Sequence, residues 1–215
     1  MRDNGDVLKP LVSVDGYDVH LIHECGVRNE AFGEEDMKRI FGQLWAQASK
    51  FPSLFSDYTK GDVRAFMVLF GNPRGVWFGV WREGELEDES PPLGVLYLTD
   101  VIMGFDADAH YAFYDGKQRG RERLMLEMIV RVMGAYDLHR LTAEFPSPMH
   151  GMASWLKRLG FHKEGVRREG VKREDRWFDT ERYGILADEA EEMRKTYIPS
   201  TADAEAADVV EEVGV

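Results

Sequence analysis

Hydrophobic positions along the chain change their spacing several times, and each spacing predicts a type of element. Between residues 34 and 50 the apolar side chains recur every three or four positions, which is the pattern of an amphipathic helix. The same spacing predicts helices at 60–70 and 117–135, and a further helix that ends at Gly160. Glycine favours the left-handed backbone conformation that often follows a last helical turn, so Gly160 is a helix stop.

Strand patterns lie before, between and after these helices. Leu11–Val14 and Asp18–His23 compete for the first strand. A three-strand meander follows, and its central member, 93–102, is apolar on both faces. The expected strands from the meander onward are 75–81, 93–102, 106–115, 139–145, 161–169 and 176–186. This order of elements predicts a single domain of mixed α/β (mixed α+β) class.

Acidic residues are concentrated at the C-terminal end. The chain of 215 residues has a net charge of −12, and residues 188–215 hold nine acidic residues against two basic ones. A segment rich in Ala, Glu and Asp is typical of a solvated, partly disordered appendage, while a docking arm for a basic partner is the alternative. We therefore expect one domain at 1–187 and an acidic tail at 188–215.

Composition narrows the class of protein. The first ten residues, MRDNGDVLKP, are polar and acidic, unlike a secretory signal, and no apolar run approaches the roughly 18 residues of a membrane helix. A single cysteine, Cys25, cannot form an internal disulfide and fits a reducing cytosol. We expect a cytoplasmic protein that contacts no membrane.

Two further clusters of polar residues do not indicate a metal site or a nucleic-acid surface. His20, His23 and Cys25 are close in sequence, but no second cluster completes a metal site, so we expect no metal. Residues 157–176 contain eight basic residues interleaved with four acidic ones, a pattern that favours a solvated hairpin over a nucleic-acid surface.

The most informative segment is DGKQRGRERL, residues 115–124. It places basic side chains and Gly120 between a strand and the first turn of a long helix. Free amides and the positive dipole end of a helix suit an anionic phosphate, and glycine permits a close approach of the backbone. The alternative is a basic helix start without a ligand, because a lone glycine among arginines is a weak motif.

Several motifs occur in the order found in one known family. LHRL at 138–141, LKRLGF at 156–161, KEGVRRE at 163–169 and RWFDTERYGIL at 176–186 follow the glycine-containing loop at family-like spacing. From about Gly94 to Leu186 the chain resembles the GNAT superfamily of acetyl-CoA-dependent N-acetyltransferases. The likeness is greatest to the branch that acetylates the N-termini of ribosomal proteins.

The resemblance implies a fold, a cofactor and a set of residues. The fold would be a mixed, largely antiparallel sheet flanked by helices, and the co-substrate would be acetyl-CoA. Residues on the strand and loop before the long helix would bind it: Phe113, Tyr114, Lys117, Gln118, Arg119, Gly120, Arg121 and Glu122.

Three positions depart from the family pattern. The family's phosphate loop is similar to Arg/Gln-x-x-Gly-x-Gly/Ala, but Glu122 stands where a small residue is usual, and its carboxylate would repel a pyrophosphate. Met149 replaces a frequent asparagine. Leu156 replaces a tyrosine that protonates the leaving thiolate in many relatives, although not in all of this branch.

Acetyl transfer to an amine requires a neutral amine and a way to move protons. In the resembling branch a carboxylate often precedes the phosphate loop, and alignment puts His110 there, where an imidazole is a candidate base. An ordinary strand residue is the alternative. We expect an N-acetyltransferase acting on a primary amine, such as a protein N-terminus, with a catalytically silent GNAT-fold module of a larger assembly (for example a phage particle) as the rival hypothesis.

Overall fold

The structure is a computed structural model in which residues 9–24, 32–50, 62–86, 89–115, 120–147, 149–173 and 175–197 are described. Its strands form one sheet in the order β1-β2-β3-β4-β5-β6-β8-β7. The strands are β1 (Val12–Val14), β2 (Tyr17–Glu24), β3 (Val76–Arg82), β4 (Gly94–Ile102), β5 (Asp106–Phe113), β6 (Arg140–Pro146), β7 (His162–Arg173) and β8 (Arg176–Leu186). The helices are α1 (Glu34–Lys50), α2 (Val63–Phe70), α3 (Glu122–Ala135), α4 (His150–Arg158) and α5 (Ala187–Thr196).

The predicted fold class is confirmed. Every pair of neighbouring strands is antiparallel except β5 and β6, so the sheet is mixed and largely antiparallel. The two segments that competed for the first strand both form strands and pair with each other as β1 and β2. The meander β3-β4-β5 is present as predicted.

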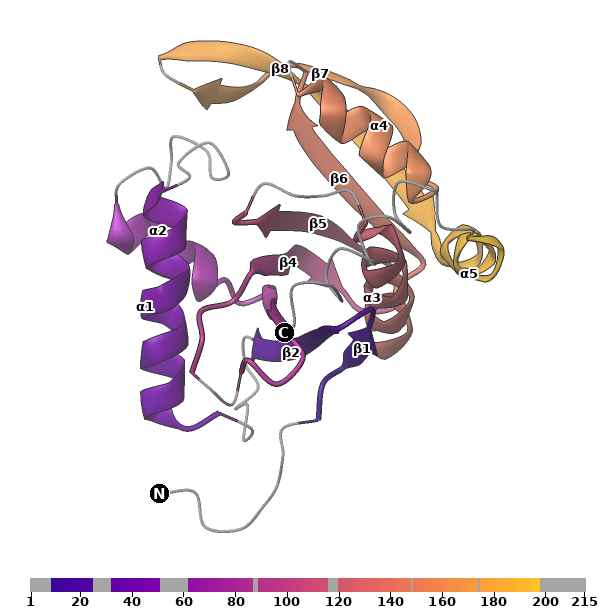
Figure 1. Cartoon of the computed structure of the whole chain (residues 1–215). Helices are drawn as coiled ribbons and strands as arrows, with labels where there is room; N and C mark the ends of the chain where they lie inside the picture. The colour runs from indigo at the N-terminus through magenta and orange to yellow at the C-terminus, as the bar shows by residue number, and fades with distance from the viewer. Residues whose placement is uncertain are drawn as a thin grey trace.

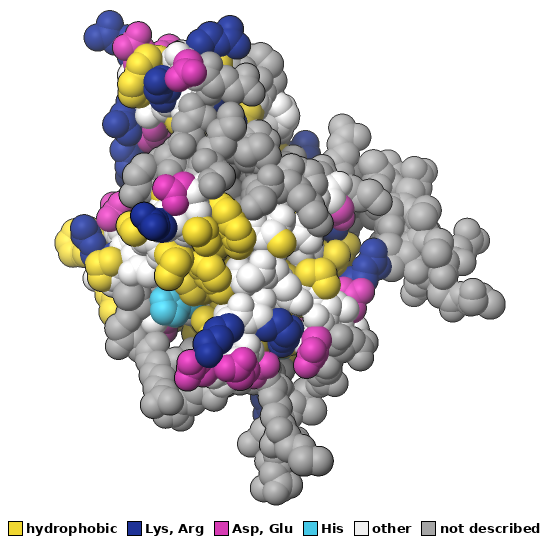
Figure 2. Space-filling model, turned by 90° about the vertical axis from the view of Figure 1, so that its left-hand side faces the viewer, with side chains coloured by type: hydrophobic (Ala, Val, Ile, Leu, Met, Phe, Trp, Pro, Cys, Tyr) yellow, Lys and Arg dark blue, Asp and Glu magenta, His cyan; other side chains and the backbone are white. Residues whose placement is uncertain are grey.

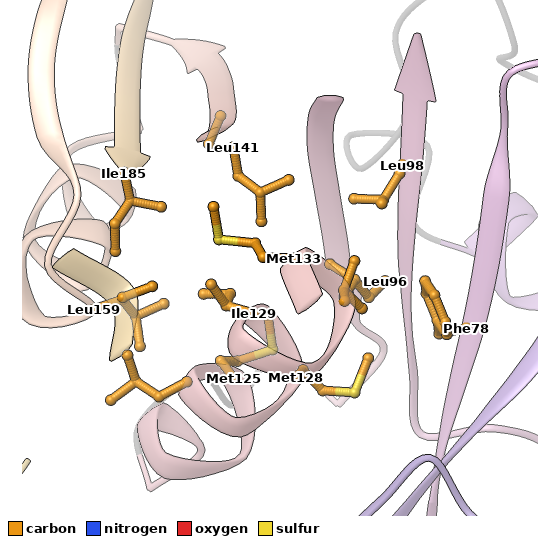
Figure 3. Close-up of a cluster of buried hydrophobic side chains, with 14 of the residues drawn as sticks. Phe78, Leu96, Leu98, Met125, Met128, Ile129, Met133, Leu141, Leu159 and Ile185 are labelled. Carbon is orange, nitrogen blue, oxygen red and sulfur yellow. The ribbon is translucent and has the colours of Figure 1, made fainter. Parts of the chain in front are cut away.

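Helices cover both faces of the sheet. Figure 1 shows α1 and α2 on one side and α3 on the other, with α5 beyond α3. Each face has its own hydrophobic core, because residues alternate between the two faces along a strand. The core beneath α3 contains Met125, Met128 and Ile129, packed against Leu96 and Leu98 of β4 (Figure 3). Methionines on this helix therefore fill the core.

The second core lies beneath α1 and α2. Ile40 and Leu44 of α1 and Phe66 of α2 are buried there against Trp77 of β3. The outer surface of α2 leaves Val63, Met67 and Val68 exposed, and Figure 2 shows hydrophobic side chains gathered on the side of the molecule that carries α1 and α2.

Gly160 ends α4 as predicted. Its φ angle is +87°, in the left-handed region. The amide of Gly160 donates to the carbonyl of Lys157, and the amide of Phe161 donates to the carbonyl of Leu156. These are the two bonds of a Schellman cap, which satisfies carbonyls at the end of the helix.

The long helix begins later than predicted. The pattern indicated a helix from residue 117, but α3 starts at Glu122, with Gly120 and Arg121 in non-helical conformations. Gly120 has a φ of +80°, which a helix does not contain. Residues 117–119 lie outside the described residues.

The packed domain also extends beyond residue 187, where the sequence analysis ended it. Residues Ala187–Thr196 form α5, in which Ala190 is fully buried and Met193 packs on the core beneath α3. Arg194 of α5 lies 3.5 Å from Glu127 of α3. The many acidic residues of this segment led to the prediction of a solvated tail. Its apolar positions are three or four residues apart, and these pack on the core: 187, 190, 193 and 197.

A truncation pair tests this corrected boundary. We expect deletion of residues 199–215 to leave the melting temperature nearly unchanged, because the described core is complete without them. A longer deletion that also removes α5 should lower the melting temperature, since it exposes the surface that Ala190 and Met193 cover. Thermal denaturation measures both. A drop of many degrees on the shorter deletion would mean that the last residues pack on the domain.

Within the described residues, no helix combines the length and the apolar character needed to cross a membrane. Three basic residues of the β7–β8 hairpin, Lys163, Arg167 and Lys172, lie within ion-pair distance of acids. Lys163 lies 3.0 Å from Glu181, and Lys172 lies 3.1 Å from Asp175. The hairpin extends past the end of the neighbouring strands in Figure 1.

Candidate functional site

Strands β5 and β6 run parallel for a short distance and then separate. The ladder joins Asp106–Asp108 to Arg140–Thr142. Beyond it β5 continues to Phe113 and β6 to Pro146, and the two strands diverge in Figure 1. α3 begins shortly after β5, and α4 follows β6, so two helix N-termini and a splayed pair of strands surround the same region. A sheet opened in this way is a natural place for a ligand.

Side chains of the protein fill most of this opening. Tyr111 of β5, Ala143 of β6, Met125 of α3 and Trp155 of α4 line the cavity that remains, whose volume is about 20 Å³. A space of that size holds one or two water molecules at most. The cleft between the strands is therefore apolar and nearly closed.

Trp155 is the largest side chain in the cleft. It is 1% exposed, and its ring centroid lies 4.3 Å from that of Tyr111 at an interplanar angle of 34°. The phenol of Tyr111 in turn contacts the sulfur of Met152, one turn earlier on α4. α4 is thus held against β5 by direct ring and sulfur contacts.

A buried carboxylate lies at the mouth of the cleft, where α3 begins. Glu122 is 1% exposed, and its Oε2 accepts a hydrogen bond of 2.9 Å from the amide of Gly120. Its Oε1 accepts hydrogen bonds of 3.0 and 2.8 Å from Nε and Nη2 of Arg158 on α4. The start of α3 therefore holds an anion that the chain itself supplies.

Arg121 is engaged within the protein. Its side chain is 4% exposed and donates hydrogen bonds of 2.8 and 2.7 Å to the two carboxylate oxygens of Asp115. The guanidinium also lies 4.4 Å from the ring centre of Phe113 and 5.3 Å from that of Tyr17. A bidentate ion pair between aromatic faces fixes the loop that precedes α3.

The residues predicted to bind the cofactor do not lie together in one site. Phe113 is buried in the core beneath α3, and Tyr114 in the core beneath α1 and α2. Gly120 and Glu122 meet at the helix start. Lys117, Gln118 and Arg119 lie outside the described residues. Their assignment to a cofactor stays a prediction.

His110 lies on the face of β5 that is turned toward the second core. Its ring stacks on Tyr97 with a centroid separation of 4.6 Å, and its Nε2 is 3.0 Å from the hydroxyl of Thr99. Burial lowers the pKa of His110 to about 4, although Glu144 and Asp100 oppose that shift. The ring is therefore neutral at pH 7 and a weak base.

Two carboxylates lie near His110 at the point where the strands separate, and the sequence analysis missed them. Asp108 lies on the same face of β5, and burial raises its pKa, while the nearby Arg182 opposes the rise. Glu144 of β6 accepts a hydrogen bond from Thr180. In the sequence, the only sign of this cluster is one acidic residue inside each of two predicted strands, Asp108 and Glu144. The parallel pairing of β5 with β6 brings them together, and the sequence does not show that pairing.

Acidification should reduce stability through His110. Between pH 6.5 and about 4 the unfolded chain binds a proton at this ring that the folded chain does not, so the free energy of unfolding falls as pH falls. We expect a loss of about 1.5 kcal/mol from His110 between pH 6.5 and 5, measured by urea denaturation.

A matched pair of variants isolates that loss. The pKa values of His20 and His23 are also lowered by burial and add to the parent's slope in the same direction. His110→Asn should flatten the dependence, whereas His162→Asn, at an exposed ring, should not. Equal slopes for His110→Asn and the parent would contradict the assignment.

The histidines near the N-terminus pack on aromatic rings. His23 stacks on Phe70 at a centroid separation of 4.8 Å, and His20 meets Trp81 edge-on at 5.8 Å. Among the residues that the structure describes, no group of three His, Cys, Asp or Glu side chains is arranged to hold a metal ion. Cys25 lies outside them.

Comparison with known proteins identifies the fold. No protein-family model matches the sequence, and no curated protein matches it. Among solved structures, the ribosomal-protein-S5-alanine acetyltransferase from Vibrio fischeri is 16% identical, with 82% of this chain and 96% of that chain covered and a TM-score of 0.60. The spermidine N-acetyltransferase from Vibrio cholerae, solved with CoA and spermine, is 14% identical, with coverages of 82% and 99% and a TM-score of 0.60. A GCN5-related N-acetyltransferase from Brucella melitensis is 13% identical, with coverages of 89% and 91% and a TM-score of 0.61.

The chain therefore has the GNAT fold, as the resemblance in its motifs implied. The two parts of the cleft differ in how they suit a CoA molecule. The Gly120 amide and Arg158 already hold a carboxylate and match an anionic head. The cleft with its cavity of about 20 Å³ does not fit a pantetheine arm while Trp155 fills it.

Proposed function

We propose that this protein is an N-acetyltransferase that transfers the acetyl group of acetyl-CoA to a primary amine. One observation carries the proposal: at the start of α3, at the mouth of the splayed strands, the Gly120 amide donates to an anionic group, the chain's own Glu122 carboxylate. Amides at a helix N-terminus and a neighbouring arginine are the donors that a phosphate group uses. The same fold in the spermidine N-acetyltransferase that was solved with CoA supports the choice of co-substrate.

The proposed acceptor is a primary amine that arrives protonated and must lose a proton before it attacks the thioester, with a protein N-terminus as the first candidate. Asp108 and Glu144 lie where β5 and β6 separate, and a carboxylate favours an approaching cation. The neutral His110 adds no positive charge that would repel it. The likeness to a ribosomal-protein acetyltransferase supports a protein N-terminus, and the likeness to a spermidine enzyme supports a polyamine as the next acceptor to test.

Mass spectrometry of candidate acceptors tests this function. The full-length protein is incubated with acetyl-CoA and either peptides with free N-termini or spermidine, and the acetylated product is quantified. Peptides with a blocked N-terminus and no lysine are the matched control. Product on free amines alone is the expected result, whereas no product from any amine at millimolar acetyl-CoA would overturn the proposal.

The rival is a catalytically silent GNAT-fold module that binds a partner in a larger assembly. The nearly closed cleft is the observation that favours it. The exposed Val63, Met67 and Val68 of α2 are the kind of apolar surface by which such a module binds another protein. If acetyl-CoA does not bind even to variants that open the cleft, the protein is the catalytically silent module.

A further inference from the structure

We propose that Glu122 and Trp155 keep the donor cleft closed by occupying the places of a ligand, and that α4 is the lid that must move to open it. The Glu122 carboxylate stands where an anionic head would bind, and the Trp155 indole fills the apolar space behind it. This inference rests on the proposed function, since it treats the cleft as the donor site.

The first half of the closure is electrostatic. Both oxygens of Glu122 are used, one by the Gly120 amide and one by Arg158. An incoming phosphate requires the same donors, so it competes directly with Glu122 for them. The side chain of Arg158 is 43% exposed, which leaves the guanidinium accessible to an anion from solvent. Glu122 is thus an internal competitor at an open entrance.

The second half of the closure is apolar. Trp155 packs on Tyr111 and lines the remaining cavity together with Leu156 and Ala143. Its indole is the largest of the side chains that line this cavity. Removing the indole creates space where an acyl-CoA arm would lie but changes no charge at the mouth.

The two halves are coupled because they share one helix. Trp155 and Arg158 are three residues apart on α4, which puts them on the same side of it. The lid is attached through a left-handed Gly160 at one end, and at the other its N-cap residue, Met149, makes no side-chain capping bond. A displacement of α4 therefore withdraws Arg158 from Glu122 and Trp155 from Tyr111 together.

Binding of two probes to a set of variants tests the closure. Inorganic pyrophosphate reports on the anionic mouth alone, and CoA reports on the mouth and the cleft. We expect Glu122→Ala to bind pyrophosphate about tenfold more tightly than the parent by calorimetry, with the gain reduced at high salt. Glu127→Ala is the matched control, because it removes the same charge from α3 at a residue paired with Arg194. Glu122→Gln keeps the shape of the side chain and should give a smaller gain.

A variant of Trp155 should affect the binding of the two probes differently. Trp155→Leu should tighten CoA binding by a larger factor than pyrophosphate binding, because it opens the cleft directly and affects the mouth only through α4. Equal gains for Glu122→Ala and Glu127→Ala, or no gain in pyrophosphate binding for either Glu122 variant, would overturn the inference. A gain with pyrophosphate but no acetyl transfer would leave the closure standing and contradict the proposed function. Acetyl-CoA binding of equal strength in the parent and in Glu122→Ala would contradict the closure and leave the proposed function standing.

Discussion

Replacing Trp155 by alanine is expected to lower the free energy of unfolding by about 3–5 kcal/mol. The indole is 1% exposed, packs against the ring of Tyr111 and belongs to the core beneath α3. Its removal loses the transfer free energy of a large side chain and enlarges a cavity of about 20 Å³ that α4 closes. Urea denaturation of the purified variant measures the change.

Trp177 provides the matched control. It lies on the β7–β8 hairpin and is 59% exposed, so Trp177→Ala should change the free energy of unfolding by no more than about 0.5 kcal/mol. Similar losses for the two variants would mean that Trp155 does not pack α4 against Tyr111 of β5. A small loss at Trp155 would also weaken the argument that it fills the cleft.

Replacing Arg121 by alanine should lower the free energy of unfolding by about 2–4 kcal/mol. The buried guanidinium makes two hydrogen bonds to Asp115 and lies over the Phe113 ring. Without it, the carboxylate of Asp115 loses these two hydrogen bonds. Because that side chain is 34% exposed, water offsets part of the penalty, and the expected loss is below that of a fully buried pair. Denaturation in urea provides the value.

Arg123 is the control for charge. It carries the same charge two residues along, pairs with Asp15 at 3.0 Å, and has an exposed side chain. Arg123→Ala should therefore cost about 0–1 kcal/mol. If Arg121→Ala were as mild as Arg123→Ala, the ion pair with Asp115 would not fix the loop before α3. Arg121→Lys should also lose stability, since an ammonium cannot form the bidentate pair or the planar stacking.

Elements with strong periodicity were predictable from sequence. The stripe at 34–50 is α1, the meander is β3-β4-β5, and Gly160 ends α4, because each of these depends on local spacing or backbone conformation. α5 was missed although its apolar positions are regular. Its acidic residues dominated the composition, and the surface that buries Ala190 comes from elsewhere in the chain.

The site was less predictable because its decisive contacts are distant in sequence. The sequence marked Glu122 as unusual for a phosphate loop, but Arg158, which binds its carboxylate, is 36 residues away. The prediction that His110 is a base assumed a solvated ring. In the folded sheet the ring stacks on Tyr97, and burial lowers its pKa, which the sequence does not show. Trp155 lies in the helix that was predicted to end at Gly160, but its contact with the cavity between β5 and β6 depends on where the parallel ladder stops.

Calorimetry of the full-length protein with acetyl-CoA tests the central claim most directly, with Glu122→Ala and Glu127→Ala measured beside it. A donor site closed by its own carboxylate predicts saturable binding to the parent and binding about tenfold tighter to Glu122→Ala, with Glu127→Ala like the parent. No detectable binding to the parent or to Glu122→Ala at millimolar acetyl-CoA would contradict the account and favour the catalytically silent module.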